Sequence, residues 1–220
     1  MFRRDKPDHG LGYNPRGARA MSGSGSIRIL GIAGSLRCAS FNRAVLRTVQ
    51  PAAPGGKQID SFDTAPIPLY NEGVRQRGFP PPVEDLRVKF KSPDGLLVVT
   101  PEYNHSIPTV LKKPGVPKNA FDRASRPSEQ SFDGKTAGLM GASPGVMGAR
   151  PAQYHRRQCF AVLNGLVMNR PEAAIPTARG KFDAAGNLRD QATRHFIATH
   201  LAALKTRALR MRLFPAACAA

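Results

Sequence analysis

The sequence predicts an α/β fold in which a doubly wound parallel sheet of five strands has helices on both faces. Strand-like and helix-like segments alternate along the chain, as they do when a helical crossover joins each strand to the next. The run GLLVVT at 95–100 is apolar throughout and lies between Gly and Pro residues, which is typical of a strand buried on both faces.

Loops rich in Pro and Gly separate the expected elements of the first half of the chain. The clearest are PAAPGG at 51–56 and the stretch 64–82, because proline and glycine interrupt both helices and strands. The expected elements here are, in order, a strand at 27–33, a helix at 40–50, a short strand within 57–63, a helix near 83–91, a strand at 95–100 and a loop with a helix over 101–126.

The second half of the chain ends in a long amphipathic helix. Ile197, Leu201, Leu204 and Ala208 follow one another at steps of four and three residues, which places them on one helix face. A fourth strand, KTAGLMGA, is less apolar than the others. The expected elements of this half are a strand at 135–142, a helix around 151–164, a strand near 166–175 and a helix at 188–213.

Five strands with helices between them favour a flavodoxin-like sheet, with the strand order 2-1-3-4-5, over a Rossmann dinucleotide fold. In such sheets ligands bind at the carboxyl ends of the strands, beside the point where the strand order reverses. The loops after the first and third strands are the most polar and unusual in the sequence. We therefore expect these two loops to form a ligand site.

The loop after the first strand contains groups that bind anions. Gly34 allows a sharp turn, Ser40 is a favourable N-cap, and Arg37 adds a forked positive charge. A helix N-terminus has unpaired N–H donors and a partial positive charge, so a phosphate fits there. The expected phosphate-binding residues are Ser35, Arg37, Ser40 and Asn42. The alternative is an ordinary strand-to-helix turn, since neither G-x-G-x-x-G nor G-x-x-x-x-G-K-[ST] is present.

The loop after the third strand, TPEYNHSIP at 100–108, is stiffened by a proline near each end. A rigid loop at the carboxyl end of a strand can offer backbone N–H groups to the edge of a planar heterocycle. Its polar and aromatic residues are Glu102, Tyr103 and Asn104, which follow Pro101. The alternative is a surface turn between two prolines.

Length and composition favour one domain, because 220 residues with 41% hydrophobic content can bury one good core. We expect this domain at 26–213, after a disordered basic extension at 1–25 and before a C-terminal tail at 214–220; Met21 is the expected natural start. No run is long and apolar enough for a membrane span, and the first residues do not resemble a secretory signal. Three cysteines without C-x-x-C spacing favour a reduced, cytoplasmic chain without a disulfide or a zinc site.

The net charge of +18 has two interpretations. One is nucleic-acid binding through phosphate neutralisation. The other is an Arg-rich, solvated surface that attracts small anions. The basic residues are spread along the chain, with no block of five or more and no recognisable nucleic-acid module, so we favour the second and expect no nucleic-acid partner.

The two loops together resemble a known family. G-S-L-R-x-x-S-x-N at 34–42 and V-V-T-P-E-Y-N-x-S-x-P at 98–108 are similar to the motifs of NADPH-dependent FMN reductases, and most of all to bacterial chromate and quinone reductases. The likeness covers about residues 27–205. Further matching segments are PIPLYNEGV at 66–74, KNAFDRASRP at 118–127, GKTAGLMGASPGVMG at 134–148, QYHRRQ at 153–158 and VMNRPEAAI at 167–175.

The resemblance implies a tightly held FMN. Its phosphate would lie on Ser35, Arg37, Ser40 and Asn42, its isoalloxazine against Pro101, Glu102, Tyr103 and Asn104, and its far side against Ser143 and Gly145. NADPH or NADH would give hydride to flavin N5 in a ping-pong cycle, and a small-molecule acceptor would then take the electrons. The family also implies a homodimer or homotetramer. Because the flavin supplies the chemistry, no catalytic side chain is expected.

Several questions stay open at this stage. The acceptor could be a quinone, chromate or, on the same scaffold, a flavin or an azo dye; a degenerate basic paralogue without turnover is a further alternative. His105 and His155 are expected to be exposed or interface residues rather than bases, because no carboxylate at sensible spacing orients either.

The sequence departs from the family pattern in three places. PTVLKK at 108–113 is followed by the near-repeat PGVPKN at 114–119, which predicts an insertion that bulges out, with the helix restarting near Lys118. Arg123 stands where relatives have Trp, which removes an apolar packing group. Arg150 lies one position early and Pro151 takes its usual place, which puts the oligomer contacts in doubt.

Overall fold

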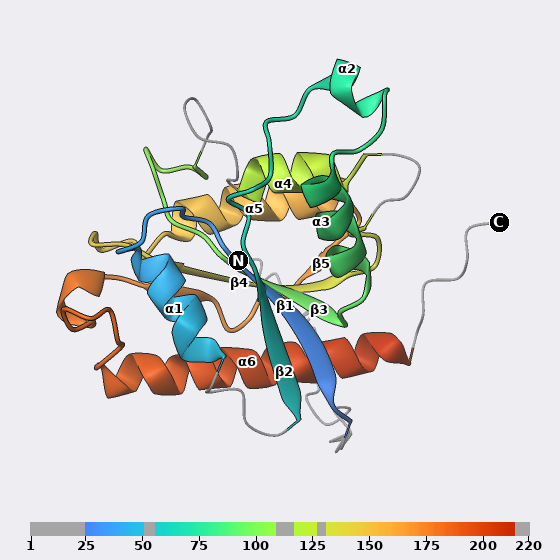
Figure 1. Ribbon diagram of the computed structural model, residues 1–220. Helices are drawn as coiled ribbons and strands as arrows, with labels where there is room; N and C mark the ends of the chain where they lie inside the picture. Colours follow the sequence, from blue (N-terminus) through green and yellow to red (C-terminus); the bar gives the residue numbers. More distant parts are fainter. Residues whose placement is uncertain (1–24, 51–55, 109–116, 127–130, 214–220) are drawn as a thin grey trace, which may run out of the picture.

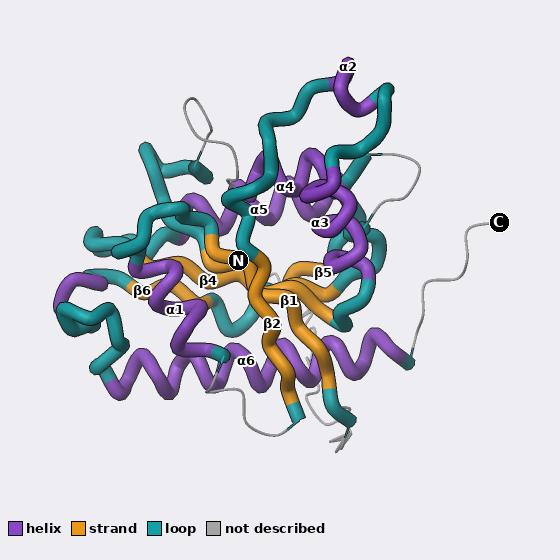
Figure 2. Tube along the Cα trace, in the orientation of Figure 1, coloured by secondary structure: helices purple, strands orange, loops and turns teal. Residues whose placement is uncertain are grey.

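The computed structural model describes residues 25–50, 56–108, 117–126 and 131–213. Within these ranges a parallel sheet has the order β2-β1-β3-β4-β5, and β6 also pairs with β4 (Figure 2). This confirms the flavodoxin-like sheet and its strand order. The strands are β1 (Ile27–Ala33), β2 (Lys57–Phe62), β3 (Gly95–Val99), β4 (Thr136–Ala142), β5 (Leu166–Val167) and β6 (Ala173–Ile175).

Two layers of helices enclose the sheet, with α1 and α6 on one face and α3, α4 and α5 on the other (Figure 1). The short helix α2 lies at the tip of the projecting segment between β2 and α3 (Figure 1). The helices are α1 (Phe41–Val49), α2 (Glu72–Arg75), α3 (Pro81–Lys91), α4 (Pro117–Ala124), α5 (Arg150–Val162) and α6 (Gln191–Arg212), with a 3-10 turn at Ala178–Gly180.

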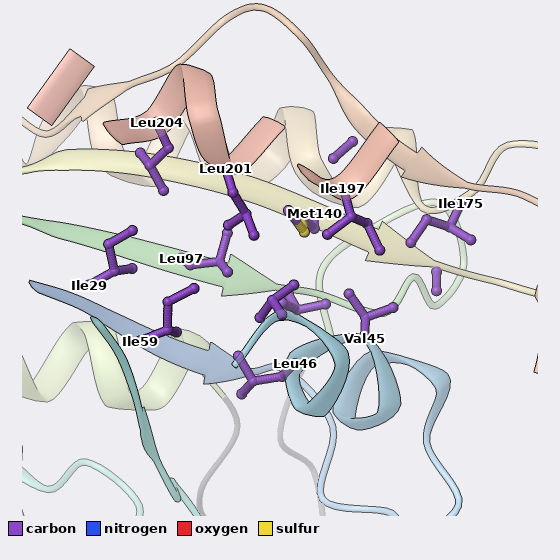
Figure 3. Close-up of a cluster of buried hydrophobic side chains, with 14 of the residues drawn as sticks. Ile29, Val45, Leu46, Ile59, Leu97, Met140, Ile175, Ile197, Leu201 and Leu204 are labelled. Atoms are coloured by element: carbon purple, nitrogen blue, oxygen red, sulfur yellow. The ribbon is translucent and has the colours of Figure 1, made fainter. Parts of the chain in front are cut away.

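Each face of the sheet has its own apolar core. On the α1 and α6 side, residues such as Val45, Leu97 and Leu201 interdigitate (Figure 3). The predicted apolar face of α6 is confirmed, because Ile197, Leu201, Leu204 and Ala208 are all buried. On the other side four aromatic rings pack edge to face. These rings belong to Phe90, Phe121, Phe132 and Phe160.

Strand β4 looked weak in the sequence because its glycines let two helices approach closely. A Cβ at Gly138 would lie 2.8 Å from His200 Nε2 of α6. At Gly141 a Cβ would lie 2.7 Å from the Cβ of Ala149, which precedes α5. Every residue of β4 is nevertheless buried. Small residues here reflect tight packing rather than exposure.

Two expectations about elements need correction, and three others fall largely outside the described residues. The single fifth strand near 166–175 is two short strands, β5 and β6, separated by a segment that contains a cis Arg170–Pro171 bond. The loop expected at 64–82 contains α2. Helix α4 begins at Pro117, in agreement with a restart near Lys118. The predicted bulge in the near-repeat at 108–119 involves residues 109–116, which lie outside the described residues, as do residues 1–24 of the expected extension, Met21 included, and the tail at 214–220. None of the described helices is long and apolar enough to cross a bilayer.

Candidate functional site

A cavity of about 340 Å³ opens at the carboxyl end of the sheet, where the loops after β1, β3, β4 and β6 converge. This volume lies within the range of small-molecule sites. Eight of the ten predicted site residues line it: Ser35, Arg37, Ser40, Asn42, Pro101, Glu102, Tyr103 and Ser143. The other lining residues, which the sequence did not indicate, are Phe41, Ala142, Pro144 and Arg179.

Gly34 joins the two predicted loops at their base. Its N–H donates to the Val99 carbonyl at 2.6 Å, and a Cβ at this position would lie 2.6 Å from Pro101 Cδ. Real Cβ atoms do not approach another heavy atom that closely, so the glycine is required by the contact rather than by a turn. The phosphate loop and the PEYN loop therefore start from adjacent, touching strand ends.

The loop from Ser35 to Ser40 folds back on itself in front of α1. The Ser35 hydroxyl accepts from Arg37 N–H at 3.4 Å, and Ser40 N–H donates to the Arg37 carbonyl at 3.2 Å. Ser40 is the N-cap, as predicted, and its hydroxyl accepts from Asn42 N–H at 3.2 Å. Both serines are buried, whereas Arg37 has no side-chain partner among the described residues. An unpaired guanidinium thus stands beside the positive end of a helix.

Asn42 lines the cavity, and its side chain also joins two elements of the fold. Its amide donates to the Ala142 carbonyl at 3.0 Å and accepts from Ala142 N–H at 2.9 Å. The side chain is buried and thereby ties α1 to the end of β4. A phosphate on this loop would thus depend on the other three predicted residues and on backbone N–H groups.

The PEYN loop is closed by two reciprocal backbone hydrogen bonds between Tyr103 and Ser106, of 3.0 and 2.9 Å. The two residues between them, Asn104 and His105, have φ of 49° and 56°, in the left-handed region. This tight hairpin turns Asn104 away from the cavity lining, while Tyr103 stays half-exposed at the cavity mouth. Non-glycine residues in this conformation often mark functional loops.

Glu102 has one satisfied and one orphaned carboxylate oxygen. Its Oε1 lies 3.3 Å from His105 Nδ1, whereas its buried Oε2 has no hydrogen-bond partner among the described residues. A buried acceptor without a partner indicates a missing ligand or water, because such groups are almost always paired. The expectation that no carboxylate orients His105 is wrong, because Glu102 Oε1 lies beside its Nδ1. His105 and His155 are exposed, as expected, and Ser106 Oγ lies 2.8 Å from His155 Nδ1.

Backbone contacts between two loops form the third wall of the cavity. Ala178 N–H donates to the Ser143 carbonyl at 3.0 Å, and Thr177 N–H donates to the Gly145 carbonyl at 3.2 Å. Gly145 supports this wall without lining the cavity itself. The next residue after Ala178 is Arg179, which does line it. The only signal for Arg179 in the sequence was a charge in a short connecting segment.

Two of the departures from the family pattern have structural explanations. Arg123 is buried, donates to the carbonyls of Pro68 and Leu69, and stands over the ring of Tyr70 at 5.4 Å. It therefore fills the position of the missing tryptophan and holds the projecting segment against α4. Pro151 occupies the first turn of α5, where proline is tolerated.

The shifted Arg150 and Tyr154 both contact the same carboxylate, that of Glu172. Arg150 Nε lies 3.7 Å from Glu172 Oε2, and the Tyr154 hydroxyl donates to Glu172 Oε1 at 3.2 Å. This cluster lies on the surface, since close to half of the Tyr154 side chain is exposed. Despite its shift by one position, Arg150 therefore has an ion-pair partner that it shares with Tyr154.

The fold and the cavity define a class of protein: a doubly wound α/β domain with a cavity at the carboxyl ends of its strands, beside the point where the strand order reverses and where such domains bind ligands. Comparison with known proteins gives the family. Residues 27–180 match the model of the NADPH-dependent FMN reductase family. The chain belongs to this family and is an oxidoreductase, with FMN as its flavin and NAD(P)H as its electron donor.

Individual relatives agree with this assignment. The chain is 46% identical to an NAD(P)H-dependent FMN reductase of Pseudomonas aeruginosa, over 86% of this chain and 99% of that one. It is 39% identical to the quinone reductase of Escherichia coli K12, over 77% and 89% of the two chains. Among solved structures, the flavoenzyme NAD(P)H:acceptor oxidoreductase FerB of Paracoccus denitrificans has a TM-score of 0.75 at 30% identity, covering 84% of this chain and 98% of that one.

Proposed function

We propose that this chain reduces quinones, chromate or similar small acceptors with NAD(P)H in a ping-pong cycle, through an FMN held in the cavity described above. The supporting observation is that one cavity is lined both by an unpaired arginine and by a carboxylate with an unpaired oxygen. An unpaired Arg37 stands beside the N-terminus of α1, and an orphaned carboxylate oxygen of Glu102 lies on the PEYN loop. One end suits an anion, and the other has a buried hydrogen-bond acceptor without a partner.

The residues present fit FMN. Ser35, Arg37 and Ser40 would hold the phosphate, because they surround the capped N-terminus of α1. Pro101, Glu102 and Tyr103 would border the isoalloxazine, whose N–H edge could donate to the orphaned Glu102 Oε2. Ser143 would close the far side, with Asn104 and Gly145 shaping the loops behind these contacts.

When bound, FMN supplies the redox chemistry by accepting hydride from NAD(P)H and passing electrons to an acceptor. The protein's part is to bind and orient. The rigid strand ends joined at Gly34 set the separation of the phosphate and ring ends of the site. Half-exposed Tyr103 at the mouth leaves room for a donor and then an acceptor to reach the same cavity in turn.

Quinones are the favoured acceptor class. Relatives at 39% and 37% identity are a quinone reductase of Escherichia coli K12 and a 2-hydroxy-1,4-benzoquinone reductase of a Burkholderia species. Chromate rests on the motif resemblance alone. Flavins and azo dyes are the alternative acceptors on the same scaffold, and no structural observation favours them.

A homodimer or homotetramer is part of the proposal. Large apolar side chains gather on the loops and helix beside the cavity, where a second copy could cover them. They are Tyr103, Val146, Met147 and Tyr154, with 43–77% of each exposed. We also propose a cytoplasmic location, since the described cysteines, Cys38 and Cys159, are both free thiols.

The visible spectrum of the purified protein tests the proposal. Bands of oxidised flavin should copurify, bleach on addition of NADPH under anaerobic conditions, and return on addition of benzoquinone. Initial rates at several fixed quinone concentrations should give parallel double-reciprocal lines if the cycle is ping-pong. A colourless protein that takes up no FMN, and instead shifts DNA in a salt-dependent way, would identify the basic binding paralogue and refute the proposal.

A further inference from the structure

Arg179 is a charged residue of the cavity that neither the sequence motifs nor the family pattern drew attention to. It lies in the 3-10 turn Ala178–Gly180 after β6, about 140 residues from the phosphate loop, and both line the same cavity. Its guanidinium has no hydrogen-bond or ion-pair partner among the described residues. An unpaired charge on a cavity wall is available to a ligand.

The backbone around Arg179 is held firmly, so the side chain starts from a defined point. Thr177 has a φ of 49°, an uncommon left-handed conformation for a β-branched residue. Its N–H and that of Ala178 are bonded to the loop after β4, and Ala178 is fully buried. Strained backbone fixed by its surroundings is typical of ligand-binding turns.

A ring contact places this turn beside the phosphate end of the cavity. Phe182, three residues after Arg179, packs on Phe41 with ring centroids 5.4 Å apart. Phe41 is the first residue of α1, directly after the Ser40 cap. The segment directly after the turn that bears Arg179 is thus packed against the N-terminus of the helix that would receive the phosphate.

The charges of the cavity match a dianion. A phosphate monoester bears about −1.5 to −2 at pH 7. The lining contains two unpaired arginines, Arg37 and Arg179, and a single carboxylate, Glu102, which lies on the PEYN loop and contacts neither arginine. One arginine would leave about half of the phosphate charge unmatched in a partly buried site.

We propose that Arg179 is a second phosphate-binding arginine, so that FMN is held by its phosphate from two loops, after β1 and after β6. This inference rests on the proposed function and deepens it. It gives the site a strong preference for FMN over riboflavin, because two charge-assisted contacts depend on the phosphate. The bound phosphate would then link the N-terminus of α1 to the segment that leads to α6.

The test compares the flavin affinities of the wild type and four variants. FMN or riboflavin is titrated with each apoprotein, and quenching of the flavin fluorescence gives the affinity. Arg179→Ala and Arg37→Ala should each weaken FMN binding about 10- to 100-fold and change riboflavin binding less than twofold. Arg179→Lys should recover part of the FMN affinity. Arg210→Ala, an equal loss of charge at an exposed position of α6 outside the cavity, should leave both affinities unchanged.

Each other outcome overturns a specific statement. If Arg37→Ala weakens FMN but Arg179→Ala does not, the inference fails and the proposed phosphate site stands. If neither variant affects FMN, the proposed site itself fails. Equal losses of FMN and riboflavin affinity in Arg179→Ala would show a structural role instead. A raised KM for NADPH but not for NADH, with FMN affinity unchanged, would assign Arg179 to the donor's 2′-phosphate and refute the inference.

Discussion

Asn42 and Ala142 exchange two hydrogen bonds, 100 residues apart in the sequence, in which one side-chain amide satisfies both backbone groups of Ala142. This pair fixes the first turn of α1 over the end of β4 and thereby sets the angle at which the helix N-terminus meets the cavity. Asn42, which the motif suggests as a ligand contact, thus also holds two elements of the fold together beside the cavity.

Asn42→Ala should therefore destabilise the fold as well as weaken flavin binding. The substitution leaves a buried N–H and a buried carbonyl without partners, at a cost of about 1–3 kcal/mol for each group. Chemical denaturation of the apoprotein measures this directly. Asn42→Asp is the second variant: it keeps an acceptor for Ala142 N–H, but it loses the donor and places a buried negative charge beside the Ala142 carbonyl, so it should also be less stable than the wild type. If Asn42→Ala lowers FMN affinity without any loss of stability, Asn42 binds the phosphate after all.

Arg37→Ala should reduce FMN affinity while leaving stability close to that of the wild type. The Arg37 side chain has no partner among the described residues, so its removal breaks no internal contact. A lost charge-assisted contact to phosphate is worth about 1.5–3 kcal/mol. Isothermal titration with FMN gives the affinity, and Arg47→Ala, at an exposed position in the last turn of α1 and outside the cavity lining, is the control. Unchanged binding in Arg37→Ala would refute the phosphate assignment.

His200 should make stability fall as the pH drops below 6.5. Burial lowers the pKa of this imidazole from 6.5 to about 4, and its ring lies 2.8 Å from the Pro171 carbonyl through Nδ1. Because the folded pKa is depressed, the unfolded chain binds the proton first. Stability is therefore full above pH 6.5 and declines by up to about 3 kcal/mol towards pH 4.

Urea denaturation between pH 7 and pH 4 checks this dependence against two variants. In His200→Asn the amide can still donate to the Pro171 carbonyl but does not titrate, so the decline over this range should be smaller than in the wild type. His195→Asn alters an exposed histidine of the same helix and should retain the wild-type slope. Equal slopes in all three proteins would show that His200 does not govern acid sensitivity.

Arg156→Leu should raise the melting temperature. All three guanidinium nitrogens of Arg156 are buried without a hydrogen-bond partner among the described residues, and desolvation lowers its pKa to about 10. Contact with the Phe121 ring, at 4.7 Å, offsets only part of this cost. Replacing buried charges by apolar groups often stabilises by about 1–4 kcal/mol.

Differential scanning calorimetry of apoprotein measures the effect of Arg156→Leu. Arg157→Leu is the matched control on the same helix, because Arg157 has satisfied partners in Asn169 and the Met168 carbonyl. That variant should be destabilised. A lower melting temperature for Arg156→Leu as well would show that the contacts of the Arg156 side chain, such as that with Phe121, outweigh its desolvation cost.

The fold was largely predictable because most elements have strong local signals. Strand β3 is a continuous apolar run, and α6 has a clear three- and four-residue apolar period. The break between β5 and β6 does have a signal, the polar run NRPE at 169–172 with its proline, which the single strand expected near 166–175 did not take into account. Strand β4 appeared weak because its glycines are required by close packing against helices that lie far away in the sequence.

The candidate site was predictable where motif residues act locally and unpredictable where they act at a distance. Ser40 caps its own helix, so its part could be inferred from the neighbouring residues. The task of Asn42 depends on Ala142, and the place of Arg179 depends on the contact of Phe182 with Phe41. Such relationships arise only once the sheet order has brought separate loops together.

The contact of Gly34 with Pro101 ties the width of the site to the distance between two paired strands of the sheet. Neighbouring strands keep a spacing of about 4.8 Å, which hardly varies with the conformation of the loops they end in. The distance between the two loops at the base of the pocket is thus set by the pairing of the neighbouring strands β1 and β3. Loop substitutions can change what fills the pocket, but widening it requires the centre of the sheet to open. Acceptor range and cofactor fit are consequently separate traits, which laboratory evolution could alter one at a time.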